Sequence, residues 1–187
     1  MKTLSAAFAV AAILSAPVLA QSRTAIAEEA EAADGLLAEL ATPGLATFEA
    51  VEQRLLRLWS QSGSDTADLL LQRGRDAMEA DDYMTAVEHL TALTDHAPDF
   101  AEGWHARAQA WFQLEEYGLA INDLMAALSL NPNHFAALTG LGVIYEEIGR
   151  PKLALSAIEE AHRLNPNSEA TGEARERLRL SIGAATL

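Results

Sequence analysis

The histidines are the residues best suited by type to metal binding or proton transfer. They are His89, His96, His105, His134 and His162. No two of them are three or four residues apart, the spacing that places two side chains on one face of a helix. The chain also has no cysteine, which excludes disulfides, thiolate metal sites and a cysteine nucleophile. We therefore expect no metal site and no cofactor, and we interpret most of the histidines as surface residues.

Two pairs of adjacent carboxylates, Asp81-Asp82 and Glu115-Glu116, are of a type used in acid–base chemistry or calcium binding. They are 34 residues apart and occupy equivalent places in an internal repeat. We therefore interpret them as turn residues that end helices. The chain has neither a glycine-rich phosphate loop nor the serine elbow of hydrolases. We expect no enzymatic activity; a hydrolase with a site between the N-terminal helices and the repeats is a less favoured alternative.

Length and charge limit the function further. The chain has 187 residues, which suits one domain or one domain with an extension. Half of the residues are hydrophobic, which is enough for a core, and the formal net charge is −14. Such an acidic chain repels phosphate backbones, so we expect no nucleic-acid partner.

The N-terminus has the pattern of a secretory signal. Lys2 precedes an almost unbroken apolar run from Leu4 to Leu19, and small residues lead to Ala20. The pattern predicts a signal peptide over residues 1–20, cut between Ala20 and Gln21, and a periplasmic or secreted protein. The run is short for a membrane span, so we expect no stable span after cleavage; an uncleaved anchor is the alternative.

Three prolines, Pro98, Pro132 and Pro166, are spaced 34 residues apart and divide the chain into the units 67–100, 101–134 and 135–168. When the units are aligned, small residues coincide in two columns. These are Gly74, Ala108 and Gly142, and then Ala86, Ala120 and Ala154. Two antiparallel helices need small residues where they approach most closely, and large apolar residues at helical spacing fill the remaining space. Each unit is therefore predicted to be a helical hairpin.

This pattern closely resembles the tetratricopeptide repeat (TPR) family over residues 67–168. The resemblance implies an all-α fold, a right-handed superhelical solenoid of three TPR hairpins. Arg73 and Arg107 stand where the family usually has leucine, whereas the third unit has Leu141. We expect looser packing at the start of the array for this reason. The signal and repeats together look like short exported bacterial TPR proteins.

The flanking segments are expected to protect the ends of the array. Residues 21–66 read as an N-terminal helical pair, over 24–41 and 45–61, which we expect to cover the first unit. A homodimer through this pair is the alternative. Residues 169–187 read as a capping helix and tail, with Ser168 as the N-cap and an apolar stripe through Leu178.

The resemblance also implies a concave groove lined by the first helix of each hairpin, where TPR proteins bind peptides. The corresponding positions are Leu71, Arg75, Met78, Glu79, His105, Gln109, Phe112, Gln113, Thr139, Val143, Glu146 and Glu147. Some family members hold a partner's C-terminal carboxylate with basic and asparagine residues, but here the groove has one base, Arg75, against three glutamates. The partner we expect is therefore a neutral or basic protein segment. The function we expect is protein–protein interaction by a non-enzymatic scaffold or adaptor, or alternatively chaperone-like assembly of envelope proteins.

Overall fold

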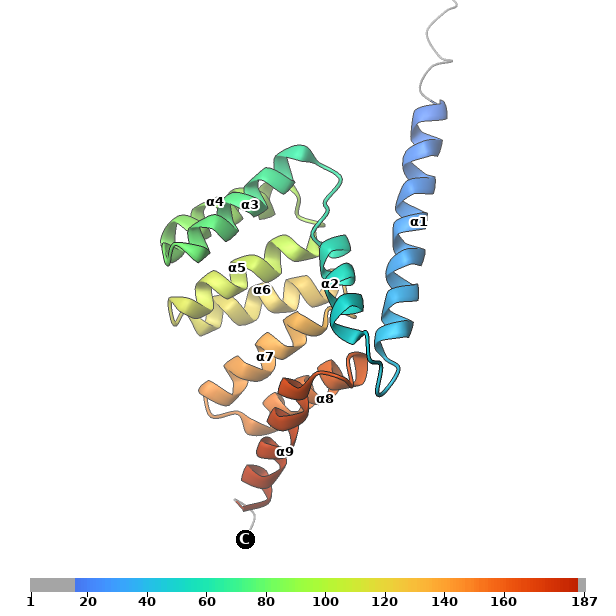
Figure 1. Cartoon of the computed structure of the whole chain (residues 1–187). Helices are drawn as coiled ribbons and strands as arrows, with labels where there is room; N and C mark the ends of the chain where they lie inside the picture. The colour runs from blue at the N-terminus through green and yellow to red at the C-terminus, as the bar shows by residue number, and fades with distance from the viewer. Residues whose placement is uncertain (1–15, 185–187) are drawn as a thin grey trace, which may run out of the picture.

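The computed structural model describes the backbone of residues 16–184 and the side chains of residues 28–184. Within these residues all regular structure is helical, as predicted (Figure 1). The helices are α1 (Ala16–Leu40), α2 (Phe48–Trp59), α3 (Asp65–Glu79), α4 (Tyr83–His96), α5 (Ala101–Gln113), α6 (Tyr117–Leu130), α7 (Phe135–Glu147), α8 (Pro151–Leu164) and α9 (Glu169–Ala184). None of the described helices is long and apolar enough to cross a membrane.

Helices α3 to α8 form three stacked hairpins, one for each predicted unit (Figure 1). Two residues after the end of the first helix of each hairpin, the backbone is left-handed. These residues are Asp81, Glu115 and Gly149, with φ of 57°, 60° and 69°. The following amide donates back to a carbonyl five residues earlier, for example from Glu116 to Trp111. This pattern is the Schellman motif, so the acidic pairs are helix-ending turns, as predicted.

Small residues set the distance between the paired helices. A methyl group added at Gly142 would lie 2.5 Å from Ile158 of the facing helix, and one at Gly74 would lie 2.5 Å from Leu90. The larger apolar side chains then fill the space between neighbouring units. Trp104, Trp111 and Tyr145 are half-buried and pack against the core of the second and third hairpins.

Helix α9 closes the C-terminal end of the array, in agreement with the predicted cap. Leu178 is fully buried against Ala154 and Ile158 of α8. Arg177 donates to Glu146 of α7 and Arg179 donates to Glu159 of α8, so exposed ion pairs on the rim add to this contact. The arginines of α9 are therefore part of a solvated cap surface.

The N-terminal pair was predicted to cover the first unit, but its apolar core packs on the third unit, so that prediction was wrong. Its apolar residues Leu40 and Leu55 are buried in a cluster with Phe135 and Leu164, which belong to the third unit. The loop between α1 and α2 is fixed there as well, because the Asn167 side chain donates to the Leu40 carbonyl and accepts from the Gly44 amide. The reason is tertiary: Phe135 begins α7 and Leu164 ends α8, and only the docking of the N-terminal pair on these helix ends brings the apolar residues together.

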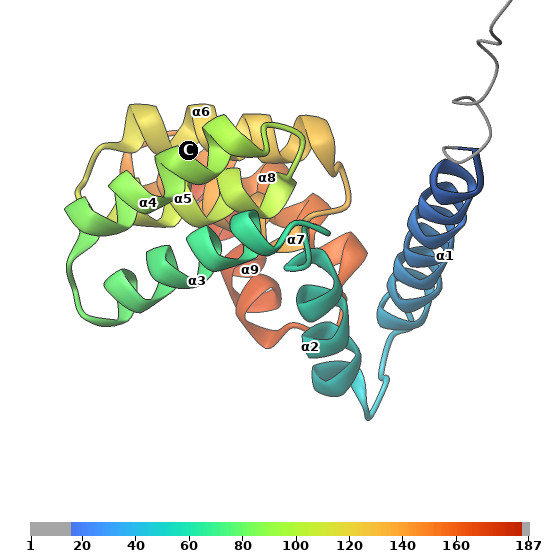
Figure 2. The ribbon, with the colours of Figure 1, turned by 90° about the horizontal axis from the view of Figure 1, so that it is seen from above.

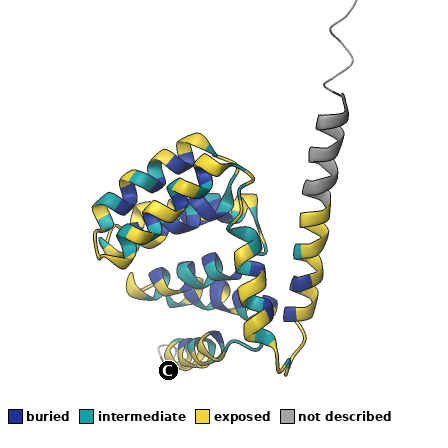
Figure 3. Cartoon of the chain, turned by 45° about the horizontal axis from the view of Figure 1, so that its top comes forward, coloured by how far each residue is buried: buried dark blue, intermediate teal, exposed yellow. Residues whose placement is uncertain are grey.

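Helix α2 crosses the array from the third unit to the first (Figures 1 and 2). At its C-terminal end, the Ser60 hydroxyl accepts a hydrogen bond from Arg75 of α3 at 3.1 Å. Helix α1 lies beside α2, and among its described side chains, residues 28–40, the buried ones are Leu36 and Leu40 near its C-terminal end (Figures 1 and 3). The apolar face that suggested a homodimer is thus used within the chain.

Residues 1–15 of the predicted signal segment, residues 1–20, lie outside the described part of the chain. The backbone of α1 begins at Ala16 and runs through the expected cleavage bond between Ala20 and Gln21. Cleavage there stays a prediction.

Candidate functional site

A cavity of about 370 Å³ lies on the inner face of the array, between α3, α5 and α7. Each of the three units contributes at least one side chain to it. Its apolar contacts include Met78, Phe112 and Val143, and its polar groups include the side-chain amides of Gln109 and Gln113. Such a mixture of apolar surface with a few polar groups is typical of sites that bind an extended ligand.

Seven of the twelve predicted groove positions line this cavity. They are Met78, His105, Gln109, Phe112, Gln113, Thr139 and Val143. The remaining five are Leu71, Arg75, Glu79, Glu146 and Glu147, and the structure places these elsewhere. Glu79 and Glu147 are exposed at the C-terminal ends of α3 and α7.

Leu71 differs from the prediction because it is only 2% exposed and belongs to the core of the first unit. Arg75 donates to Ser60 at the end of α2 and forms an ion pair with Glu102 of α5. Glu146 pairs with Arg177 of α9 through contacts of 3.1 and 2.8 Å. The one base and one of the glutamates predicted for the groove are thus neutralised by neighbouring helices.

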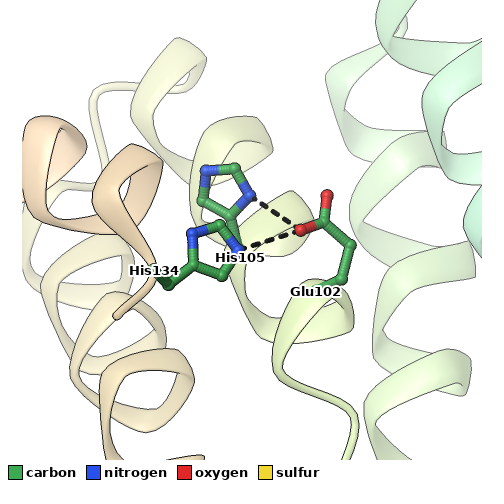
Figure 4. A group of neighbouring side chains, drawn as sticks. All are labelled: Glu102, His105 and His134. Carbon is green, nitrogen blue, oxygen red and sulfur yellow. Dashed lines mark hydrogen bonds and ion pairs between the residues drawn. The ribbon is translucent and has the colours of Figure 1, made fainter. Parts of the chain in front are cut away.

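Three titratable side chains meet at the N-terminal end of α5 and form a cluster that was not predicted from the sequence (Figure 4). The Glu102 carboxylate oxygen Oε2 lies 3.0 Å from His134 Nε2 and 3.4 Å from His105 Nδ1. The two imidazole rings are 4.5 Å apart, and Trp59 of α2 lies against His134 with ring centres 5.0 Å apart. Both histidines are buried and are thus exceptions to the interpretation of most histidines as surface residues.

A buried glutamate with two histidines is a set of ligands that suits zinc by type. The local hydrogen bonds oppose this role. His134 is the N-cap of α7, and its Nδ1 accepts a hydrogen bond from the Ala137 amide at 3.2 Å. A neutral imidazole that accepts at Nδ1 carries its proton at Nε2, the atom that faces Glu102. That nitrogen therefore donates to the carboxylate, and Arg75 adds a positive charge on the other carboxylate oxygen. The residues fit a hydrogen-bonded ion-pair cluster, and they do not fit a metal ion.

The titration behaviour of the cluster has the same physical basis. Burial opposes the charged form of Glu102, but the hydrogen bond from His134 and the nearby His105 imidazole outweigh it and hold the Glu102 pKa well below its usual range. Burial lowers the pKa of His134, against the opposing effect of the Glu102 carboxylate. The folded protein therefore favours a charged Glu102 and a neutral His134.

One sequence signal was available for this cluster. Glu102 and His105 are three residues apart and share a face of α5. In the sequence, this spacing was considered only for pairs of histidines and not for a glutamate with a histidine. His134 is 32 residues further along the chain, and only the stacking of α7 on α5 brings it to Glu102.

The chain belongs to the tetratricopeptide repeat family, as the resemblance predicted. The family model matches residues 71–128 and 114–169, which span the three hairpins. A TPR repeat-containing protein of Rhizobium etli is 32% identical over 145 residues, which cover 76% of this chain and 70% of that protein.

Solved TPR domains have the same fold. The first TPR domain of Spaghetti (RPAP3), bound to the HSP90 peptide SRMEEVD, aligns with a TM-score of 0.62 and 22% identity, over 64% of this chain and 95% of that one. The Sgt2 TPR domain from Aspergillus fumigatus aligns with a TM-score of 0.62 and 24% identity, over 66% and 83% of the two chains.

Proposed function

We propose that this chain is an exported, non-enzymatic adaptor that holds an extended segment of another protein in its groove. The observation that carries the proposal is the cavity between α3, α5 and α7, to which all three repeat units contribute. Met78, Phe112 and Val143 supply apolar contacts, and the amides of Gln109 and Gln113 supply donors and acceptors for a backbone. For a groove of this size we expect binding in the micromolar range, about −8 kcal/mol.

The charges favour a neutral or basic segment over an acidic one. No lysine or arginine lines the cavity, and Arg75, the one base predicted for the groove, is paired with Glu102. The exposed carboxylates of Glu79 and Glu147 stand at the C-terminal ends of two of the lining helices. The peptide seen on the Spaghetti domain carries three acidic residues and is a poor match for this surface.

The alternative is a chaperone-like factor that assembles envelope proteins by binding extended segments of many clients. The polar lining favours it in one respect, because amides and hydroxyls bind any extended backbone without reading its sequence. An adaptor selects one dominant motif from a peptide library, whereas a chaperone-like factor retains many unrelated apolar segments.

Groove binding is tested by selection of a displayed random decapeptide library on the purified chain. We expect enrichment of peptides with a large apolar residue, and about ten-fold weaker binding of them by Phe112→Ala or Gln109→Ala. Leu153→Ala is the matched control, because Leu153 is exposed on α8 and lines no part of the groove. A library that shows no enrichment, or an equal response of all three variants, contradicts the proposal.

Export is tested separately, by fractionation of bacteria that express the full chain and by sequencing of its N-terminus. We expect a periplasmic or secreted protein that begins at Gln21. A chain that keeps residue 1 and stays in the cytosol contradicts this part of the proposal without affecting the groove.

A further inference from the structure

A second cavity, of about 220 Å³, adjoins the groove where α2 crosses it. It shares His105, Gln109, Ala136 and Thr139 with the groove cavity, so a ligand in one lies beside the other. Its outer wall includes Glu52 of α2, and its floor includes Asn165, which follows α8. No lysine or arginine lines it.

Asn165 carries a buried acceptor without a donor. Its Nδ2 donates to Glu52 Oε2 at 2.8 Å, and because only the amide nitrogen can donate to a carboxylate, this bond fixes the orientation of the amide. The Asn165 side chain is then left with Oδ1 unpartnered, although the residue is only 2% exposed. A buried polar atom without a partner costs free energy, so its presence beside a cavity points to a missing donor.

The matching residue of the second unit shows what Asn165 would otherwise do. Asn131 lies 34 residues earlier. Its Oδ1 accepts a hydrogen bond from the Asn133 backbone amide at 3.1 Å, so this side-chain oxygen has a partner within its own turn. Asn165 has the same place in the third unit but is directed to α2 instead. The unsatisfied acceptor is therefore created by the contact with Glu52.

The cavity is lined by a carboxylate and an unpartnered amide oxygen, and by no lysine or arginine that could pair with them. Glu52 brings a carboxylate that forms no ion pair among the residues described by the structure. The hydroxyls of Thr139 and Thr171 already donate to backbone carbonyls, of Phe135 and Ser168, and cannot supply the missing proton. Apolar atoms of Ala136 and Phe135 complete the wall.

We propose that this cavity binds a lysine or arginine side chain of the segment held in the groove, an inference that rests on the proposed function. The cationic head would donate to Glu52 and to Asn165 Oδ1, while its aliphatic stem would contact Ala136 and Phe135. One carboxylate and one amide oxygen are too few ligands for calcium, which takes six to eight oxygens. The partner is thus a segment with a basic residue at a fixed spacing from a large apolar one.

The test is the same random decapeptide display library, selected in parallel on the wild-type chain, on Glu52→Gln and on Glu49→Gln. Glu49→Gln is the control because it removes the same charge from the same helix. Glu49 is exposed and does not line the cavity. On the wild type and on Glu49→Gln we expect lysine or arginine at one spacing from the apolar residue. On Glu52→Gln we expect the apolar preference alone.

Individual peptides then measure the effect. A selected peptide is compared with its Lys→Gln version on each protein by fluorescence anisotropy. Loss of one charge-assisted hydrogen bond predicts about ten-fold weaker binding of the Lys→Gln version to the wild type and no difference on Glu52→Gln.

The outcomes separate the two proposals. Enrichment of apolar peptides without a spaced basic residue overturns the cation site and leaves the groove function intact. An equal loss of the basic preference on Glu49→Gln also overturns it, because general attraction to an acidic surface then explains the result. No enrichment on any protein overturns the proposed function and this inference together.

Discussion

The second and third hairpins have the same fold but different interiors. In the second, Arg107 of α5 donates two hydrogen bonds to Asp123 of α6, at 2.7 and 2.8 Å, and both side chains are largely buried. The equivalent positions of the third hairpin are Leu141 and Ala157, which are buried in the apolar core. A further difference occurs at the start of the first helix, where the second unit has Glu102 and the third has Ala136.

The comparison shows that the repeat accepts a charged pair in its core when each group is fully paired. Arg107 also donates to Thr91 and Thr94 of α4, and its guanidinium lies 4.9 Å from the centre of the Trp104 ring. Arg107 thus bonds to two helices, α4 and α6, whereas looser packing at the start of the array stays a prediction. These polar contacts tie the second unit to the first, a specific link that an apolar side chain does not make.

The largest expected effect comes from breaking the charged pair. Asp123→Ala leaves the Arg107 guanidinium without its carboxylate in a largely buried place, which costs about 3 kcal/mol. Urea denaturation followed by circular dichroism measures the loss in the free energy of unfolding.

The double variant Arg107→Leu with Asp123→Ala gives the second unit the residues of the third. It is expected to recover most of that loss and to lie within about 1 kcal/mol of the wild type. A double variant as unstable as Asp123→Ala would show that the two interiors are not interchangeable.

A smaller effect is expected from the small-residue column, where the second unit has Ala108 and the third has Gly142. Gly142→Ala places a methyl group 2.5 Å from Ile158, and the strain exceeds the gain in helix propensity. We expect a loss of about 1 to 2 kcal/mol in the same denaturation experiment. Gly118→Ala is the control, because the space around Gly118 is open, and it should stabilise the chain slightly. Equal behaviour of the two variants would contradict the close approach of α7 and α8.

The smallest expected effect concerns the turn between the paired helices. Glu115 of the second unit has φ of 60°, whereas the third unit has Gly149 in the same place. Glu115→Gly relieves the left-handed strain and is expected to stabilise the chain by about 0.5 to 1 kcal/mol. The thermal midpoint should rise accordingly, and Gly149→Ala should lower it. A fall in the midpoint of Glu115→Gly would mean that the carboxylate itself supports the turn.

The sequence predicted the hairpins well because each depends on local patterns that recur every 34 residues. Seven groove residues followed from the same regularity, since the first helix of every unit has one inner face. Leu71 was misplaced because the first unit has no preceding repeat, and its inner face lies near α2 instead. Glu102 and His134 were missed because they lie 32 residues apart, at opposite ends of the second unit, and only the stacking of α7 on α5 brings them together.

The sequence by itself determined the helical hairpins, their number and their turns, because helix periodicity, small-residue columns and left-handed turn positions are local properties. Only the tertiary structure decided where α2 lies, which histidines are buried and how Glu52 meets Asn165. The physical reason is that these contacts join residues that are distant along the chain, up to 113 positions apart for Glu52 and Asn165. Burial and shape at such contacts depend on how whole helices dock, which no short stretch of sequence records.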